Sequence, residues 1–198
     1  MFPQSDVEDI ARIAKSLGLS VHLDGARIWN ASVRTKVALA ALAAPADTVS
    51  VCYSKGLGAP VGSALLGSRE LITRARRLRK MWGGAMRQAG ILAAGAAYAL
   101  AHNVARLAQD HEHARLFAER LRERGVSSAE PQTNIVMVDV PGQAADVVAA
   151  ARASGLLLNT ASDTRMRAVF HLEITEADAI RAGDTLAEAI TRVQKAAS

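Results

Sequence analysis

Hydrophobic residues recur along the chain with two spacings, one typical of helices and one typical of strands. Residues 5–16 place apolar side chains three and four positions apart, begin with Ser5 and carry acidic residues in the first turn, as an amphipathic helix does. Gly18 ends this pattern, and residues 19–23 then alternate as a strand does until Asp24 interrupts them. The sequence therefore predicts a helix, a strand and a polar loop, in that order.

Further helices and strands alternate along the rest of the chain. Apolar residues at helical spacing predict helices over 28–43, 69–81, 86–124 (one long or two nearly continuous), 143–154 and 176–195. Runs of β-branched and apolar residues between turn residues predict strands over 48–53, 61–66, 134–140, 156–158 and 166–171. This alternation predicts an α/β fold whose last part forms a smaller α+β layer.

The composition predicts a soluble globular protein. Half of the residues are hydrophobic and only 4% are aromatic, so the core is built mainly from Ala, Val, Leu and Ile. The longest apolar runs, 37–45 and 90–101, are shorter than the roughly 20 residues that span a bilayer, and from the acidic residues of the first segment we expect no signal sequence. The single cysteine, Cys52, excludes an internal disulfide and is typical of the reducing cytoplasm, where we expect the protein.

The net charge of +5 arises mainly between residues 69 and 87. Such a basic segment raises the possibility of a nucleic-acid interface. Its basic side chains are spread around most of the predicted helix and are not interleaved with aromatic residues, which binding to bases would favour. A solvated or anion-facing helix is therefore the preferred interpretation, and neither a nucleic-acid nor a membrane partner is expected.

Two short motifs place reactive side chains after predicted strands. In HLDGAR, residues 22–27, Asp24 follows a strand at the sheet edge where open α/β sheets bind ligands, although an isolated Asp there is more often a cap or turn residue. In SKGLGAPVG, residues 54–62, Lys55 follows the next strand within a glycine-rich loop. The loop is not a phosphate-binding P-loop because the lysine precedes the glycines, and an isolated lysine of this kind usually lies on the surface.

The two motifs are more informative together. Asp24 and Lys55 are 31 residues apart and follow strands separated by one predicted helix, so both can reach one pocket. Pyridoxal phosphate requires such a pair, a lysine for the Schiff base and an acid beside the pyridine nitrogen. The pair predicts this cofactor and no metal site.

The chain resembles the low-specificity threonine aldolases of pyridoxal-phosphate fold type I, also called aromatic amino acid β-eliminating lyases/threonine aldolases. The resemblance covers essentially the whole chain and is carried by HLDGAR with WNA (22–31), SKGLGAPVGS (54–63), RK with GGAMRQAG (79–90), TNIV (133–136) and MR leading to His171 (166–171). It implies that 1–103 is the C-terminal part of a cofactor-binding large domain, and that 104–198 is a small α+β domain.

The resemblance also implies roles for particular residues. Lys55 would form the Schiff base and Asp24 would pair with the pyridine nitrogen, with Arg27 beside the cofactor. Arg27 and Arg167 would bind the substrate carboxylate, which suits the planar guanidinium fork. Phe170 stands where the family usually has a threonine, just after this last arginine.

Two further residues are implied to lie at an interface between subunits. Lys80 and Arg87 would lie near the active site of a neighbouring subunit in a homodimer or homotetramer. A solvated helix charge for Lys80 and a structural salt bridge for Arg87 are equally plausible interpretations.

The implied reaction is cleavage of a β-hydroxy amino acid, L-threonine or L-allo-threonine, to glycine and acetaldehyde. Family members are longer, and nothing in residues 1–198 matches their phosphate-binding loop, the histidine that stacks on the ring or the histidine near the substrate hydroxyl. Three alternatives stay open: a catalytically incompetent structural remnant, a β-eliminating lyase and a transaminase.

Overall fold

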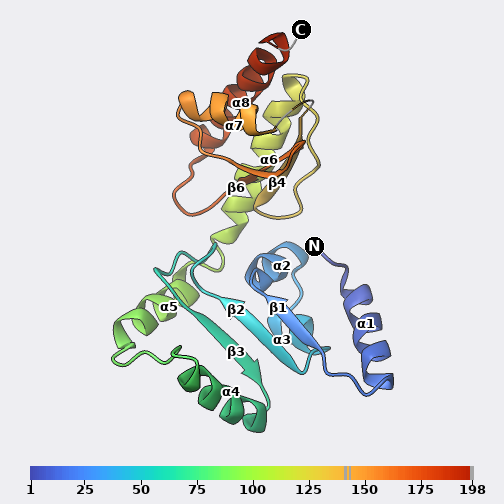
Figure 1. The fold of residues 1–198 in the computed structure, drawn as a ribbon, viewed down its shortest axis with the longest axis vertical. Helices are drawn as coiled ribbons and strands as arrows, with labels where there is room; N and C mark the ends of the chain where they lie inside the picture. Colours follow the sequence, from blue (N-terminus) through green and yellow to red (C-terminus); the bar gives the residue numbers. More distant parts are fainter. Residues whose placement is uncertain (141, 143, 197–198) are drawn as a thin grey trace. The chain divides into compact units, whose positions relative to one another are not determined.

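The computed structural model describes residues 1–140, 142 and 144–196, which form two compact units, Met1–Arg106 and Leu107–Ser198 (Figure 1). Each unit contains a three-stranded sheet with helices packed against it. The elements of the first unit are α1 Gln4–Ser16, β1 His22–Gly25, α2 Ile28–Thr35, α3 Leu39–Ala43, β2 Thr48–Cys52, β3 Ser63–Gly67, α4 Arg69–Met81 and α5 Gly90–His102. Mixed helix and sheet of this kind confirms the predicted α/β class.

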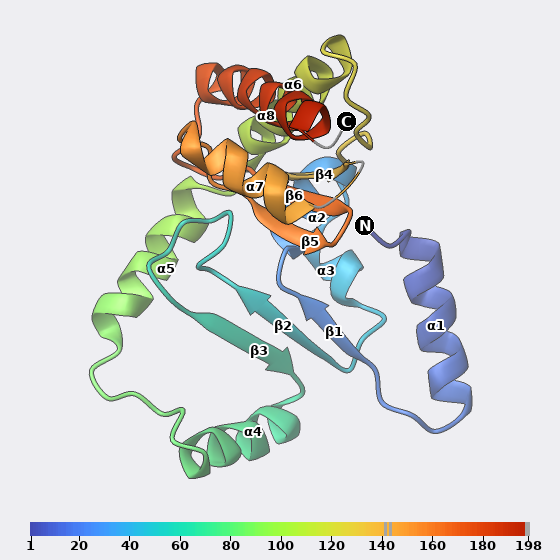
Figure 2. The same ribbon diagram turned by 45° about the horizontal axis from the view of Figure 1, so that its top comes forward.

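The sheet of the first unit has the order β1-β2-β3, and the three strands lie side by side in Figure 2. β1 runs parallel to β2, with Asp24 opposite Ser50, whereas β3 runs antiparallel to β2. Because α1 precedes β1, and α2 with α3 connects β1 to β2, helix and strand alternate as predicted. The parallel pair places the carboxyl ends of β1 and β2 at one edge of the sheet.

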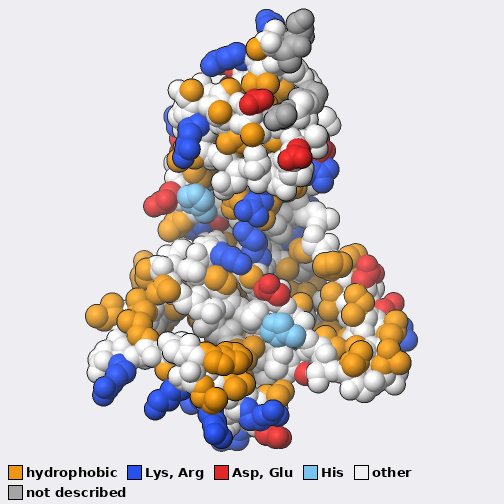
Figure 3. All heavy atoms as spheres, viewed as in Figure 1, with side chains coloured by type: hydrophobic (Ala, Val, Ile, Leu, Met, Phe, Trp, Pro, Cys, Tyr) orange, Lys and Arg blue, Asp and Glu red, His pale blue; other side chains and the backbone are white. Residues whose placement is uncertain are grey.

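The core of this unit is small. Its buried members are Ile28 of α2, Leu42 of α3, and Val49 and Val51 of β2, so α2 and α3 cover one face of the sheet. Many large hydrophobic side chains elsewhere in the unit are exposed, and Figure 3 shows hydrophobic side chains spread over α1 and α5. The first unit thus leaves much apolar surface uncovered by its own residues.

The helix predicted over 28–43 is two helices. Lys36 adopts the left-handed conformation (φ 62°), and its N–H bonds to the Ser32 carbonyl at 2.8 Å, which ends α2. The Ser32 hydroxyl donates to the Val37 carbonyl at 2.7 Å and holds the following turn. No glycine or proline marks this break, so the sequence pattern did not reveal it.

The second unit contains α6 Leu107–Glu123, β4 Ile135–Asp139, α7 Ala144–Ala153, β5 Asn159–Ser162, β6 Arg165–Val169 and α8 Glu176–Ala196. Its sheet is antiparallel with the order β4-β6-β5, and Ile135 pairs with Val169. One face of the sheet packs against the helices through a continuous core that includes Phe117, Val136 and Met166. This core is larger than that of the first unit.

The sequence predicted one long helix or two nearly continuous ones over 86–124, and a strand over 156–158. The pattern over 86–124 forms two helices, because α5 ends at His102 and α6 begins at Leu107. Residues 156–158 are not a strand, because the Leu156 N–H bonds back to the Ala151 carbonyl at 3.0 Å and closes the end of α7 in a Schellman arrangement. The predicted helix over 143–154 begins at Gln143, which lies outside the described residues.

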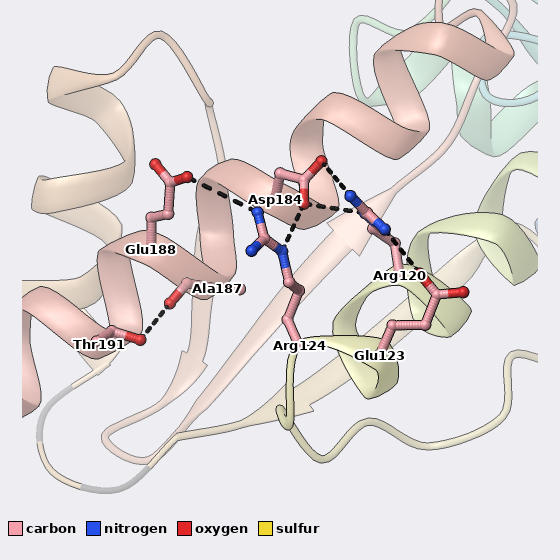
Figure 4. Close-up of polar contacts among 7 residues, drawn as sticks. All are labelled: Arg120, Glu123, Arg124, Asp184, Ala187, Glu188 and Thr191. Carbon is pink, nitrogen blue, oxygen red and sulfur yellow. Dashed lines mark hydrogen bonds and ion pairs between the residues drawn. The ribbon is translucent and has the colours of Figure 1, made fainter.

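α6 and α8 are held together by an ionic network (Figure 4). Asp184 accepts hydrogen bonds from Arg120 Nε at 2.9 Å and from Arg124 Nε at 2.7 Å. The helices approach closely beside it, since a Cβ on Gly183 would lie 2.8 Å from Arg120 Cβ. The network therefore fixes how α8 lies against α6 within the second unit.

No single helix among the described residues has the length and hydropathy to cross a membrane. α5 and α6 satisfy that test only when they are added together across the break between them.

Candidate functional site

Asp24 lies near the end of β1, with its side chain exposed on the face of the sheet opposite to α2 and α3. The alternation along β1 and β2 places Asp24 beside Ser50, whereas Val49 and Val51 point to the covered face. Its Oδ1 accepts a hydrogen bond from the Ala26 N–H at 3.1 Å, which fixes the carboxylate in a short turn.

Lys55 lies in the loop that follows β2, the strand paired with β1. Its side chain is exposed, while the backbone around it is tightly held. The Gly58 N–H bonds to the Lys55 carbonyl at 2.9 Å, and Gly58 adopts a φ of 73° that favours glycine. Tyr53 closes the loop at its base, since its N–H bonds to the Gly62 carbonyl and its carbonyl accepts from Ala59. A reactive side chain is thus presented on a rigid turn.

α2 links the two motifs, with Arg27 at its start and Trp29 in its first turn. Arg27 is half-buried and lies immediately before α2, three residues after Asp24. Trp29, in the first turn of α2, stacks on Tyr53 with ring centroids 6.4 Å apart. Because Tyr53 lies two residues before Lys55, this contact ties the start of α2 to the lysine loop. A cavity of about 220 Å³ beside β1 is lined in part by Asp24 and Arg27.

The lysine loop has support from α5 that the sequence motifs did not reveal. The Asn103 side chain donates from Nδ2 to the Leu57 carbonyl at 2.7 Å, and Arg106 Nη2 donates to the Gly56 carbonyl at 3.4 Å. These donors follow their acceptors by 46 and 50 residues. No local sequence pattern indicates such a contact.

Lys80 and Arg87 come later in the sequence than the ends of β1 and β2. Lys80 is in the last turn of α4, and Arg87 is in the segment between α4 and α5; both side chains are exposed. Figure 3 shows that basic side chains gather along α4. Ser68 caps this helix by accepting from the Leu71 N–H at 3.2 Å, as predicted.

Arg167 belongs to the second unit, in the central strand β6. It is exposed, on the sheet face opposite to the buried Met166 and Ala168. Arg165 shares its face but is held by Asp139, with Nε 2.6 Å from Oδ1. This ion pair lowers the pKa of the Asp139 carboxyl and raises the pKa of Arg165. Arg167 thus has an ion-paired neighbour on the same strand.

The chemistry of the first unit fits pyridoxal phosphate at two positions. An exposed carboxylate lies near the carboxyl end of β1, and an exposed amine lies in the loop after the parallel strand β2, where they could meet the ring nitrogen and the aldehyde carbon. An α/β unit with this pair has the features of a protein that holds an aldehyde cofactor through a lysine.

The chain belongs to the β-eliminating lyase family, whose model matches residues 1–143. This confirms the family resemblance found in the sequence. Members of this family, which includes the threonine aldolases, depend on pyridoxal phosphate.

Two relatives and one solved structure illustrate the similarity. The chain is 43% identical over 183 residues to the probable low-specificity L-threonine aldolase 2 of Arabidopsis thaliana, covering 89% of this chain and 52% of that protein. It is 43% identical over 176 residues to the low specificity L-threonine aldolase of Escherichia coli O157:H7, covering 88% and 52%. The chain therefore spans about half the length of these relatives.

The solved structure is a putative aromatic amino acid β-eliminating lyase/threonine aldolase from Exiguobacterium sp. 255-15. It superposes with a TM-score of 0.77 at 24% identity, over 96% of this chain and 58% of that one. This similarity confirms that the chain has the fold of these lyases.

Proposed function

We propose that this chain carries part of a pyridoxal-phosphate-dependent aldolase that cleaves L-threonine or L-allo-threonine to glycine and acetaldehyde. The observation that carries the proposal is the placement of Asp24 near the carboxyl end of β1 and of Lys55 in the loop after β2, the parallel strand paired with β1. The names of the Arabidopsis and Escherichia coli relatives support this reaction over others of the family.

The cofactor, when bound, supplies a sink for the electrons of the broken Cα–Cβ bond. Lys55 would hold the cofactor through its ε-amine, the nucleophile that an aldehyde group needs. Asp24 would hold the ring nitrogen, and its carboxylate would favour the protonated form of that nitrogen. Arg27 and Arg167 bind the substrate carboxylate through two-point hydrogen bonds and so set which bond of Cα is cleaved.

We further propose that residues 1–103 are part of a cofactor-binding large domain and that 104–198 form a small domain. The active protein would be a homodimer or homotetramer in which Lys80 and Arg87 approach a neighbouring subunit's site. The exposed hydrophobic side chains around these two residues, which include Met81, Trp82 and Met86, support an interface there.

A cytoplasmic location is proposed on the cysteine content. The chain has one cysteine, Cys52, which is a free thiol in the structure.

The substrate is a small β-hydroxy amino acid.

Reductive trapping tests the cofactor assignment. The purified chain is incubated with pyridoxal phosphate, treated with borohydride and digested, and the modified peptide is located by mass spectrometry. We expect the modification on Lys55 and its loss in Lys55→Ala, while Lys15→Ala, which removes an exposed lysine of α1, leaves it unchanged. Equal modification of several lysines would reject the assignment.

Product analysis tests the reaction. Incubation with L-threonine and with L-allo-threonine is expected to give glycine and acetaldehyde in equal amounts. Release of ammonia with a keto acid would instead identify a β-eliminating lyase, the activity that names the family. Specific trapping on Lys55 without any product would identify an incompetent remnant.

A further inference from the structure

We propose that Asn103 is a positioning residue for Lys55, with Arg106 as a second, longer contact to the same loop. Asn103 Nδ2 lies 2.7 Å from the Leu57 carbonyl oxygen, and Arg106 Nη2 lies 3.4 Å from the Gly56 carbonyl oxygen. Two consecutive carbonyls, directly after the lysine, thus accept hydrogen bonds from one short segment at the end of α5.

The segment is itself fixed by the helix. Asn103 is the C-cap residue of α5, and its N–H bonds to the Ala99 carbonyl at 2.9 Å. Its side chain is half-buried together with the loop carbonyl that it bonds. A donor at a helix end has little freedom to follow a moving loop, so it restrains the loop instead.

α5 lies along the loop on a face of small residues. Gly95, Ala99 and Asn103 are spaced four residues apart, which places them in one row. A Cβ on Gly95 would lie 3.1 Å from Pro60 Cδ, so the helix is in contact with the far end of the loop. Ala99 is 1% exposed, and Leu57 is equally buried. The loop is therefore held at Pro60 by packing and at Leu57 by a hydrogen bond.

The catalytic meaning of this arrangement rests on the proposed function, because it concerns where the Lys55 amine is held. The peptide units of Gly56 and Leu57 follow the lysine directly, and the turn that they form closes on the Lys55 carbonyl. Restraining these units fixes the Lys55 Cα and so the direction of its side chain. Asn103 would touch neither cofactor nor substrate and would act only through the lysine.

Amide hydrogen exchange of the full chain without cofactor tests the clamp independently of the proposed function. The reporters are the N–H groups of Gly58 and Ala59, which bond within the loop. In Asn103→Ala we expect both to exchange roughly fivefold faster, the factor that corresponds to losing one ordinary hydrogen bond. Unchanged exchange would overturn the proposal.

Two more variants separate hydrogen bonding from packing. Asn103→Asp keeps the side-chain size but replaces the donor with an acceptor, so it should resemble Asn103→Ala if the hydrogen bond matters. Behaviour like the wild type would assign Asn103 a packing role and overturn the proposal. His102→Ala is the matched control: the His102 ring contacts Tyr98 in a tilted arrangement, with centroids 4.3 Å apart, and its loss should leave exchange in the loop unchanged. Asn103→Ser replaces Asn103→Ala if the latter does not fold.

Kinetics of the loaded enzyme then test the link to Lys55. A misplaced lysine slows the steps in which its amine reacts, whereas binding of the carboxylate is left intact. We expect kcat to fall about tenfold in Asn103→Ala, with KM changed less than about twofold. A rise in KM as large as the fall in kcat would overturn the positioning role. Absence of trapping on Lys55 in the wild-type chain would reject the proposed function. The exchange result would still test the contact between Asn103 and the loop, because it needs no cofactor.

Discussion

At the scale of single residues, the chain presents its reactive groups outward and holds their backbone rigid. Lys55 is exposed, yet the Gly56 and Leu57 that follow it are buried. Arg167 shows the same contrast, because it projects from the central strand between the buried Met166 and Ala168. Exposed side chains on fixed backbone suit the binding of a ligand, because the backbone loses little conformational freedom when the ligand binds.

The pair of arginines on β6 provides a prediction with its own control. Arg167→Lys should raise KM for the amino acid by roughly tenfold, with kcat nearly unchanged, because an ammonium cannot form the two-point contact of a guanidinium. Steady-state kinetics with L-threonine measures this.

Arg165→Lys is the matched variant, since Arg165 lies on the same face of the same strand but is paired with Asp139. It should leave KM within about twofold. Equal increases in both variants would indicate damage to β6 and not loss of a carboxylate contact.

At the scale of elements, the pairing of α6 with α8 depends on Asp184. The hydrogen bond from Arg120 has the largest effect on this carboxylate, and the one from Arg124 adds to it. Together they lower the pKa of Asp184 below the usual range. A lowered folded-state pKa adds stability that is fully present above the ordinary aspartate pKa of about 4 and is lost as the pH falls through the lowered value. The contact thus stabilises the second unit at neutral pH and weakens in acid.

Asp184→Asn should therefore lower the free energy of unfolding at pH 7 and have a smaller effect near pH 3. Urea unfolding of wild type and variant at the two pH values measures the difference. Glu188→Gln is the control from the next turn of α8, because Glu188 lies 3.9 Å from Arg124 and is largely exposed. A pH-independent effect of Asp184→Asn would show that the carboxylate acts through packing and not through charge.

Most elements could be predicted from the sequence because their periodicity and end signals are local. The basic helix with its Ser68 cap and the strand before Lys55 are examples. The break of α2 at Lys36 could not be predicted, since a lysine has no intrinsic preference for the left-handed conformation and the break is stabilised by the side-chain bond from Ser32 to Val37. The leucines at 156–158 were mistaken for a strand, because the first of them closes the end of α7.

The candidate site was predictable where it depends on strand ends. Asp24 and Lys55 could be paired from their spacing because consecutive parallel strands end at one edge of a sheet. Asn103 could not be found in this way, since it contacts the lysine loop from 46 residues away and belongs to no motif. Contacts of this range depend on how α5 packs, which the sequence pattern does not give.

At the scale of the whole molecule, the two units differ in how well they cover their own hydrophobic residues. In the second unit, Leu157, Leu172 and Ile180 are the only exposed large hydrophobic side chains among the described residues. The first unit exposes many more, including Ile13 and Ile91, which is 86% exposed. Exposed apolar surface on this scale favours association with other protein surfaces.

Separate expression of the units tests this difference. The fragment Leu107–Ser198 should be monomeric and unfold cooperatively, because its core is continuous. The fragment Met1–Arg106 should self-associate at the same concentration. Sedimentation velocity and thermal unfolding followed by circular dichroism measure both properties. A monomeric first fragment with a cooperative transition would contradict the expectation.

The distance along the chain between the lysine loop and Asn103 has a consequence for the timing of synthesis. At a translation rate of about 5–20 residues per second, the ribosome adds Asn103 roughly 2–10 seconds after Leu57, its hydrogen-bond partner. During this interval the nascent chain already contains a reactive amine in a loop that α5 does not yet hold. The newly made loop is therefore mobile for a time before it presents Lys55 in one direction. During that time the Lys55 amine would react with aldehydes without selectivity.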